Sequence, residues 1–171
     1  MKYFEMLVKR ASFEDAKEIL DLQKLAYVSE AEIYNDYSIA PLTQTLDQIR
    51  ADFESLIFLK ASIDGRIVGS VRGFMDQGTC HIGKLIVHPD FQNRGVGARL
   101  VQEIEGCFHE AERYELFTGH LSERNLRLYH RLGYIPFAFE AVTGSLTLVF
   151  MEKRPRISRR PTSHELSSDG H

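Results

Sequence analysis

The spacing of apolar and polar residues divides the first third of the chain into three segments. Apolar and polar residues alternate over 4–11, which predicts a strand. Segment 12–27 has apolar residues at helical spacing behind Ser12, a good N-cap residue, and predicts a helix. Segment 43–55 predicts a second helix by the same spacing. The polar and aromatic stretch between the two helices, 28–41, predicts a short helix followed by a loop.

The middle of the chain reads as three strands joined by tight turns. Strands are predicted at 56–63, 66–76 and 79–88. Asp64-Gly65 separates the first two, and Asp-Gly between apolar runs is a strong hairpin signal. Gln77-Gly78 separates the second from the third. These three strands should therefore form an antiparallel meander.

Helical and alternating patterns follow one another in the last third. The stretch 95–111 is strongly amphipathic and predicts a long helix. A strand is expected at 114–120 and a helix at 122–133, with Ser and Gly at its ends. Segments 134–142 and 145–153 predict a closing hairpin around a Thr-Gly turn.

Composition and length favour a single globular domain at 1–153. The 171 residues are 43% hydrophobic and 26% charged, which are ordinary values for a protein with a packed core. The tail 154–171 is rich in Pro, Ser and Arg and poor in apolar residues, so we expect it to be disordered.

Charge and residue usage also exclude several classes of function. A net charge of -3 argues against a nucleic-acid partner. No apolar run is long enough to span a membrane. Cys80 and Cys107 do not form a metal-binding or disulfide pattern, and the seven histidines are scattered, so no metal site is predicted. A cytoplasmic protein with free thiols is the simplest expectation.

Residues 88–100, HPDFQNRGVGARL, set two glycines one residue apart where a predicted strand gives way to a helix. The first N–H groups of a helix have no intrahelical partner and carry partial positive charge, so they attract phosphate. Gly95 and Gly97 leave out the side chains that would keep a phosphate away. Arg94 and Arg99 add positive charge nearby. The segment therefore predicts a phosphate-binding loop.

Two common nucleotide-binding loops do not fit this segment. A P-loop needs Gly-Lys-Ser/Thr, whereas Ala98 and Arg99 follow the second glycine. A dinucleotide fingerprint needs a small residue where Leu100 stands, and a parallel start where this chain has hairpin-linked strands.

The remaining pattern, QNRGVG at 92–97 after LIVHP, resembles the pyrophosphate loop Q/R-x-x-G-x-G/A of the GNAT superfamily of acyl-CoA-dependent N-acetyltransferases. The resemblance covers about 4–153 and includes NLRLYHRLGY at 125–134 as well as the order of the elements. It implies an α/β (α+β) fold. That fold has a mixed, mostly antiparallel twisted sheet of about seven strands and about four helices, with the fourth and fifth strands splayed apart.

The resemblance also implies how acetyl-CoA is held, without a metal. The backbone of three strand residues would pair with the pantetheine arm: Leu85, Ile86 and Val87. The loop and the first turn of the helix would hold the pyrophosphate: Gln92, Asn93, Arg94, Gly95, Val96, Gly97, Ala98 and Arg99. Asn125 would contact the cofactor arm.

Asn125 and Tyr129 lie four residues apart and so share one face of the predicted helix. In the superfamily the Tyr hydroxyl points at the thioester sulfur as a general acid. A thiol has a pKa of about 8.5 and a Tyr of about 10, so the proton transfer is uphill by about 2 kcal/mol. Tyr129 is therefore expected to assist the reaction rather than govern it.

His81 stands where some histone acetyltransferases of the superfamily carry a Glu base. An alkylammonium of pKa about 10.4 is only about 0.1% neutral slightly above pH 7. The site must therefore supply a base, a water path to one, or an environment that favours the free amine. Strand alternation would place His81 on the same face as Gly83, Leu85 and Val87. Its role is either base or pocket-shaping residue.

The acceptor side is expected in the segment after the first helix, where Glu30 would attract a cationic amine and Tyr34 would wall the site. We expect acetyl transfer to a primary amine of a small molecule or peptide by direct attack in a ternary complex. A non-catalytic CoA-binding or sensing module on the same fold is the alternative. The acceptor stays open among polyamine, aminoglycoside, amino acid, peptide N-terminus and lysine, and a homodimer is one option for the assembly.

Overall fold

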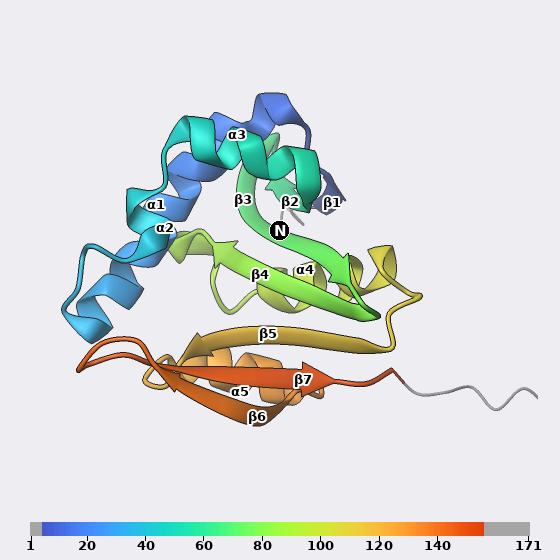
Figure 1. The fold of residues 1–171 in the computed structure, drawn as a ribbon. Helices are drawn as coiled ribbons and strands as arrows, with labels where there is room; N and C mark the ends of the chain where they lie inside the picture. Colours follow the sequence, from blue (N-terminus) through green and yellow to red (C-terminus); the bar gives the residue numbers. More distant parts are fainter. Residues whose placement is uncertain (1–4, 156–171) are drawn as a thin grey trace, which may run out of the picture.

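A computed structural model describes residues 5–155, whose seven strands form one sheet in the order β1-β2-β3-β4-β5-β7-β6 (Figure 1). The strands are β1 (Met6–Arg10), β2 (Ile57–Ile63), β3 (Arg66–Asp76), β4 (Thr79–Val87), β5 (Arg113–Gly119), β6 (Ile135–Ala141) and β7 (Thr147–Lys153). All neighbours pair antiparallel except β4 and β5, which pair parallel. The expected fold class is confirmed. The predicted tail at 154–171 lies outside the described residues from residue 156 onward.

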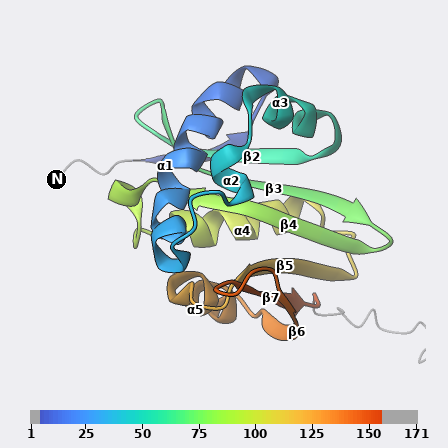
Figure 2. The same ribbon diagram turned by 60° about the vertical axis from the view of Figure 1, so that its left-hand side comes forward.

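Helices cover the two faces of the sheet unequally. They are α1 (Ala16–Tyr34), α2 (Ala40–Thr43), α3 (Leu46–Ser55), α4 (Val96–Cys107) and α5 (Glu123–Arg131), with short 3-10 turns η1 (Phe13–Asp15) and η2 (Pro89–Phe91). Helices α1 to α3 lie over β1–β4 on one face, and α4 and α5 lie on the other (Figures 1 and 2). None of the helices formed by 5–155 is both long and apolar enough to cross a membrane.

Both predicted tight turns of the meander are present. Asp64 and Gly65 have φ of 51° and 75°, and Gln77 and Gly78 have φ of 47° and 80°. Positive φ at both central residues matches the right-handed twist of the paired strands. The β2-β3-β4 meander is therefore confirmed.

Helix α1 is longer than the spacing predicted, because segment 28–34 continues it instead of forming a separate short helix. It ends at Asn35, which adopts the left-handed conformation at φ 49°. One polar residue of α1 faces inward: Gln23 is fully buried and accepts a hydrogen bond from the guanidinium of Arg72 on β3. Asp52 of α3 also pairs with this Arg72, so a polar network fastens α1 and α3 to the sheet.

Strands β4 and β5 remain together for only three residue pairs. Thr79, Cys80 and His81 pair with Arg113, Tyr114 and Glu115, and no pairing continues beyond them. The remaining edge of β4 that faces β5 is open (Figure 1). This is the splay that the family resemblance implied.

Strand β4 also contains a β-bulge at Lys84. Arg72 of β3 pairs with Gly83, but Ser70, two residues away, pairs with Ile86, so β4 has one residue too many. Lys84 takes up the irregularity with φ of 50°. An extra residue reverses the inward and outward alternation of every residue that follows it.

The bulge corrects the predicted orientation of His81. Ile82 packs in the same core as Leu85 and Val87, next to α4, whereas Ile86 belongs to the core under α1. His81 neighbours Ile82 on the strand and therefore points to the α1 face, away from Leu85 and Val87. The prediction that the three share a face is wrong because simple alternation does not allow for the bulge.

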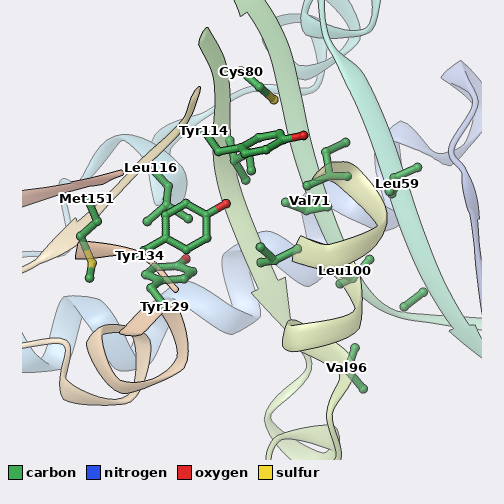
Figure 3. Packing of buried hydrophobic residues seen from close by; sticks show 14 of the residues in the cluster. Leu59, Val71, Cys80, Val96, Leu100, Tyr114, Leu116, Tyr129, Tyr134 and Met151 are labelled. Carbon is green, nitrogen blue, oxygen red and sulfur yellow. The ribbon is translucent and has the colours of Figure 1, made fainter. Parts of the chain in front are cut away.

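The core beside α4 joins the two halves of the sheet where their backbone pairing fails. Leu100 of α4 contributes to it together with Val71 of β3, Leu116 of β5 and Met151 of β7 (Figure 3). Burying apolar surface gains about 25 cal/mol per Å². Side-chain packing therefore replaces part of the cohesion that the missing strand pairing would provide.

Gly69 of β3 allows α4 to approach the sheet closely, and we predict that Gly69→Ala destabilises the fold. An added Cβ would lie 2.9 Å from atoms of both Leu100 and Val96 and 3.1 Å from the carbonyl oxygen of Ile86. Overpacking of this kind costs about 1–3 kcal/mol, which urea denaturation should show as a lower free energy of unfolding. Gly83→Ala is the control, because no atom lies within 4 Å of its added Cβ. Equal losses from the two variants would contradict the prediction.

Candidate active site

A cleft of about 720 Å³ opens where β4 and β5 separate. It is bounded by the second half of α1, the end of β4, the loop before α4 and the start of α5. All the residues predicted to hold the cofactor line it except Arg94 and Arg99: Leu85, Ile86, Val87, Gln92, Asn93, Gly95, Val96, Gly97, Ala98 and Asn125. Segments that are far apart in the sequence therefore meet at one cavity.

The loop at the mouth of α4 exposes helix-start amides to this cleft. Asn93 and Gly95 adopt left-handed conformations with φ of 61° and 79°. The first intrahelical bond runs from the N–H of Arg99 to the carbonyl of Gly95, which leaves the amides before it without an intrahelical acceptor. Such a helix start binds anions well.

The two glycines of the loop serve different purposes. Gly95 has open space around it and is needed for its positive φ. A Cβ on Gly97 would lie 3.3 Å from Leu128 of α5 and 3.6 Å from Val87. Gly97 therefore lets α4 and α5 converge on β4, so the small residue also serves packing.

Arg94 and Arg99 do not line the cleft. The Arg94 guanidinium lies 5.2 Å from the ring centroid of Phe91. Arg99 donates to the carbonyl of Met6 at 3.0 Å and lies 3.7 Å from the carboxylate of Glu103. Their positive charge is close to the loop, but their side chains are engaged elsewhere.

Two other arginines line the cleft instead, Arg124 and Arg131 of α5. They stand seven residues apart with Leu128 between them, so the three share one helix face. That spacing was visible in the sequence, but an exposed arginine pair on a helix is too common to be informative. Only the fold places this pair opposite the glycine loop.

Asn125 and Tyr129 of α5 occupy different environments. The Asn125 amide donates to the hydroxyl of Thr118 on β5 at 3.3 Å and lines the cleft. Tyr129 is buried and packs against Tyr134, with ring centroids 6.1 Å apart (Figure 3). Burial, with Tyr27 and Glu30 nearby, raises the pKa of the Tyr129 phenol well above its ordinary value.

Glu30 and Tyr34 form a clamp between α1 and the loop that follows β5. The N–H of Leu121 donates to the Tyr34 hydroxyl at 3.0 Å, and this hydroxyl lies 2.8 Å from the hydroxyl of Ser122. Ser122 in turn donates to the carboxylate of Glu30. Gly119 has to be glycine, because a Cβ there would lie 1.9 Å from the Tyr34 oxygen. Tyr34 is thus buried and holds α1 to the loop after β5, whereas Glu30 also lines the cleft.

His81 stands at the vertex where β4 and β5 part. Its Nδ1 lies 2.9 Å from Oε2 of Glu115, its partner on β5. The other oxygen of Glu115 accepts from Arg113 at 3.1 Å, and Arg113 also pairs with Glu152 of β7. A carboxylate on Nδ1 fixes the proton there and leaves Nε2 as an acceptor. The sequence did not single out Glu115 or Arg113, because only the strand register brings them to His81.

Residues 5–155 contain no group of three or more His, Cys, Asp or Glu side chains that could hold a metal ion. The residues found near the splay are a His–carboxylate pair, a buried Tyr and a row of helix-start amides.

The sequence matches the family model described as "Acetyltransferase (GNAT) family" over residues 16–134. This range includes the cleft, the loop and the whole of α5. It covers more than half of the chain.

Two curated proteins are similar to the chain at 29% identity. UPF0157 protein YqkA of Bacillus subtilis (strain 168) aligns over 136 residues, 79% of this chain and 39% of that protein. The uncharacterized N-acetyltransferase MJ1530 of Methanocaldococcus jannaschii aligns over 106 residues, 57% of this chain and 67% of that protein. The chain thus spans well under half the length of the first of them.

Among solved structures, the fold is similar to yncA, described as a putative acetyltransferase from Salmonella typhimurium with its cofactor acetyl-CoA. The TM-score is 0.70 with 20% sequence identity, covering 92% of this chain and 98% of that one. At that identity the likeness concerns the fold.

Proposed function

The chain belongs to the GNAT acetyltransferase family, and on that premise we propose that it transfers an acetyl group from acetyl-CoA to a primary amine of a small molecule or peptide. The observation that carries the proposal is the cleft itself. It combines an open strand edge at Leu85–Val87 with a row of free amides at the start of α4.

These groups suit the two chemically different parts of the cofactor. The open backbone of β4 can hydrogen-bond an amide-rich pantetheine arm as an added strand would. The first amides of α4, from Val96 to Ala98, suit a pyrophosphate, and Arg124 and Arg131 offer charge-assisted bonds to phosphate. Asn125 keeps its amide oxygen free to accept a bond. When bound, acetyl-CoA supplies an acyl carbon activated as a thioester.

His81 is proposed as the base that accepts a proton from the amine. Glu115 orients the imidazole so that Nε2 faces away from the pair and can accept a proton. His81 takes one proton from the ammonium, and the neutral nitrogen then forms its bond to the acyl carbon. The carbon–sulfur bond breaks with its electron pair on the sulfur, and the nitrogen loses a second proton to the departing thiolate or to solvent. Glu30 contributes negative charge that favours a cationic acceptor near the cleft.

Tyr129 is proposed as a hydrogen-bond donor to the departing sulfur. Its raised pKa makes full proton transfer less favourable than for an ordinary Tyr. A thiolate can leave without that proton near neutral pH, since thiol pKa values lie near about 8.5. Tyr129 thus assists departure while the amine-side proton sets the pH dependence.

The proposed function is tested by thermal shift with CoA and by thiol release from acetyl-CoA with a panel of primary amines. Binding at a hundred times Kd should add about 2.7 kcal/mol of stability by mass action. We expect stabilisation by CoA and amine-dependent thiol release. Stabilisation without release for any amine would favour a non-catalytic CoA-binding module. If CoA does not stabilise the protein and no amine releases thiol, the proposed site is rejected.

We predict that His81→Gln lowers turnover 10- to 100-fold near neutral pH while leaving CoA affinity unchanged. General-base catalysis contributes about 10²–10⁴-fold. The loss should shrink as the pH approaches the amine pKa of about 10.4, because the amine then loses its proton unaided. Steady-state rates across pH measure this, and Glu115→Gln should reproduce most of the loss. A loss of equal size at every pH would remove His81 from proton transfer.

We predict that Tyr129→Phe lowers turnover several-fold with little change in CoA affinity, because one hydrogen bond to the leaving group is removed. Single-turnover thiol release measures this step. Tyr134→Phe is the matched control: that hydroxyl is buried without a hydrogen-bond partner among the described residues, so its removal should not slow release. Unchanged turnover in Tyr129→Phe would exclude the proposed role.

A further inference from the structure

Within residues 5–155, no helix lies over the α1 face of β5, β7 and β6. In Figure 1 this face lies bare at the front, while α5 lies behind it. On β5, Tyr114 and Leu116 are buried toward the helices, so Glu115 and Phe117 point to the bare face. Phe117 stands two residues past the last residue that pairs with β4, where the strands separate. The bare face therefore begins at the splay.

Two groups of rings, here together called the aromatic floor, lie on this face and at the adjoining vertex, with Glu115 and Arg113 between them: Phe74 and His81, and Phe117, Phe137 and Phe150. Phe74 and His81 stack with ring centroids 4.9 Å apart on the β4 side. Phe117 and Phe150 are cross-strand partners with centroids 5.4 Å apart, and Phe137 lies 6.3 Å from Phe150.

The exposed area of these rings is large for a folded chain. Phe117 is 53% exposed, Phe137 43% and Phe74 41%. Single exposed apolar residues are ordinary, but a contiguous exposed patch marks a binding surface. This patch directly adjoins the His81–Glu115 pair.

The charged side chains of the floor have a net negative charge. Arg113 lies over the ring of Phe137 and pairs with both Glu115 and Glu152, so two carboxylates face one guanidinium. One negative charge is left over beside the rings. This arrangement is complementary to an organic cation that carries an apolar ring.

We propose that the aromatic floor binds the acceptor and selects primary amines attached to an aromatic body. This inference rests on the proposed acetyl transfer. The ring of the acceptor stacks on Phe117 and Phe150, and its amine reaches His81 at the vertex. Stacking of ring pairs is favourable with centroids about 4.5–7 Å apart.

A second copy of the chain fits this surface less well than a small amine. The cores of stable protein interfaces are depleted in charge, whereas Arg113, Glu115 and Glu152 lie in the middle of the floor. The floor also reaches His81 and Glu115, the last residue pair that joins β4 to β5.

The experiment compares Phe117→Thr with Phe139→Thr. Phe139 is 69% exposed but pairs with Val149, a residue of the helix-side core, so it points away from the floor. Thr keeps a high strand propensity in both variants. Thiol release is measured with phenethylamine and ethylamine, and with the tripeptides Phe-Gly-Gly and Gly-Gly-Gly. Phenethylamine binding to the CoA-loaded protein is measured separately by calorimetry.

We expect wild type to prefer phenethylamine over ethylamine by at least tenfold in kcat/KM. Phe117→Thr should lose that preference while keeping its CoA affinity, and Phe139→Thr should change neither. A matching preference for Phe-Gly-Gly over Gly-Gly-Gly would indicate a peptide N-terminus as the source of the ring, and its absence a free amine.

Thiol release without any preference for aromatic amines would overturn the inference and leave the proposed function standing. If no amine releases thiol but phenethylamine binding still depends on Phe117, the proposed function fails and the aromatic site stands. Loss of a dimer by light scattering in Phe117→Thr, with acceptor preference unchanged, would assign the floor to a second copy and overturn the inference.

Discussion

The structure depends on one incomplete strand pairing. Strands β4 and β5 share three residue pairs and then part, which leaves backbone donors and acceptors open in the middle of a sheet. Buried backbone groups of this kind require partners. The cleft exists because the fold supplies none from its own strands. The splay is therefore a weak point of the sheet and also the opening that forms the cleft.

Side chains keep the two halves of the sheet in place despite this gap. The core beside α4 spans strands from both halves, and the Tyr34 clamp joins α1 to the loop after β5. Ser145, from the loop between β6 and β7, also donates to the carbonyl of Tyr34. The C-terminal end of α1 thus bridges the mouth of the splay, as the view in Figure 2 shows from the side. Polar contacts suit this task, because they fix direction as well as distance.

Much of the architecture could be predicted because it is governed by local rules. The two tight turns, the helix start at the glycine loop and the closing hairpin depend on residues adjacent in sequence. The last part of α1 was missed because Tyr34 is a polar residue in an inward position, where its partner Leu121 lies 87 residues away in sequence. Glu115, Arg124 and Arg131 could not be singled out for the same reason, since strand register brings Glu115 to His81 and helix placement brings the two arginines to the cleft. Tyr129 could be picked out from its motif, but the extent of its burial could not.

The single extra residue in β4 gives the two halves of the strand opposite side-chain alternation. His81, before Lys84, points to the α1 face, whereas Leu85 and Val87, after it, pack in the core beside α4. Substitutions upstream of the bulge can thus alter the α1 face of the strand without changing Leu85 and Val87, which line the cleft. A shortening by one residue would instead turn half the strand over and break both arrangements at once. A small irregularity in length thereby lets the two halves of one strand change independently.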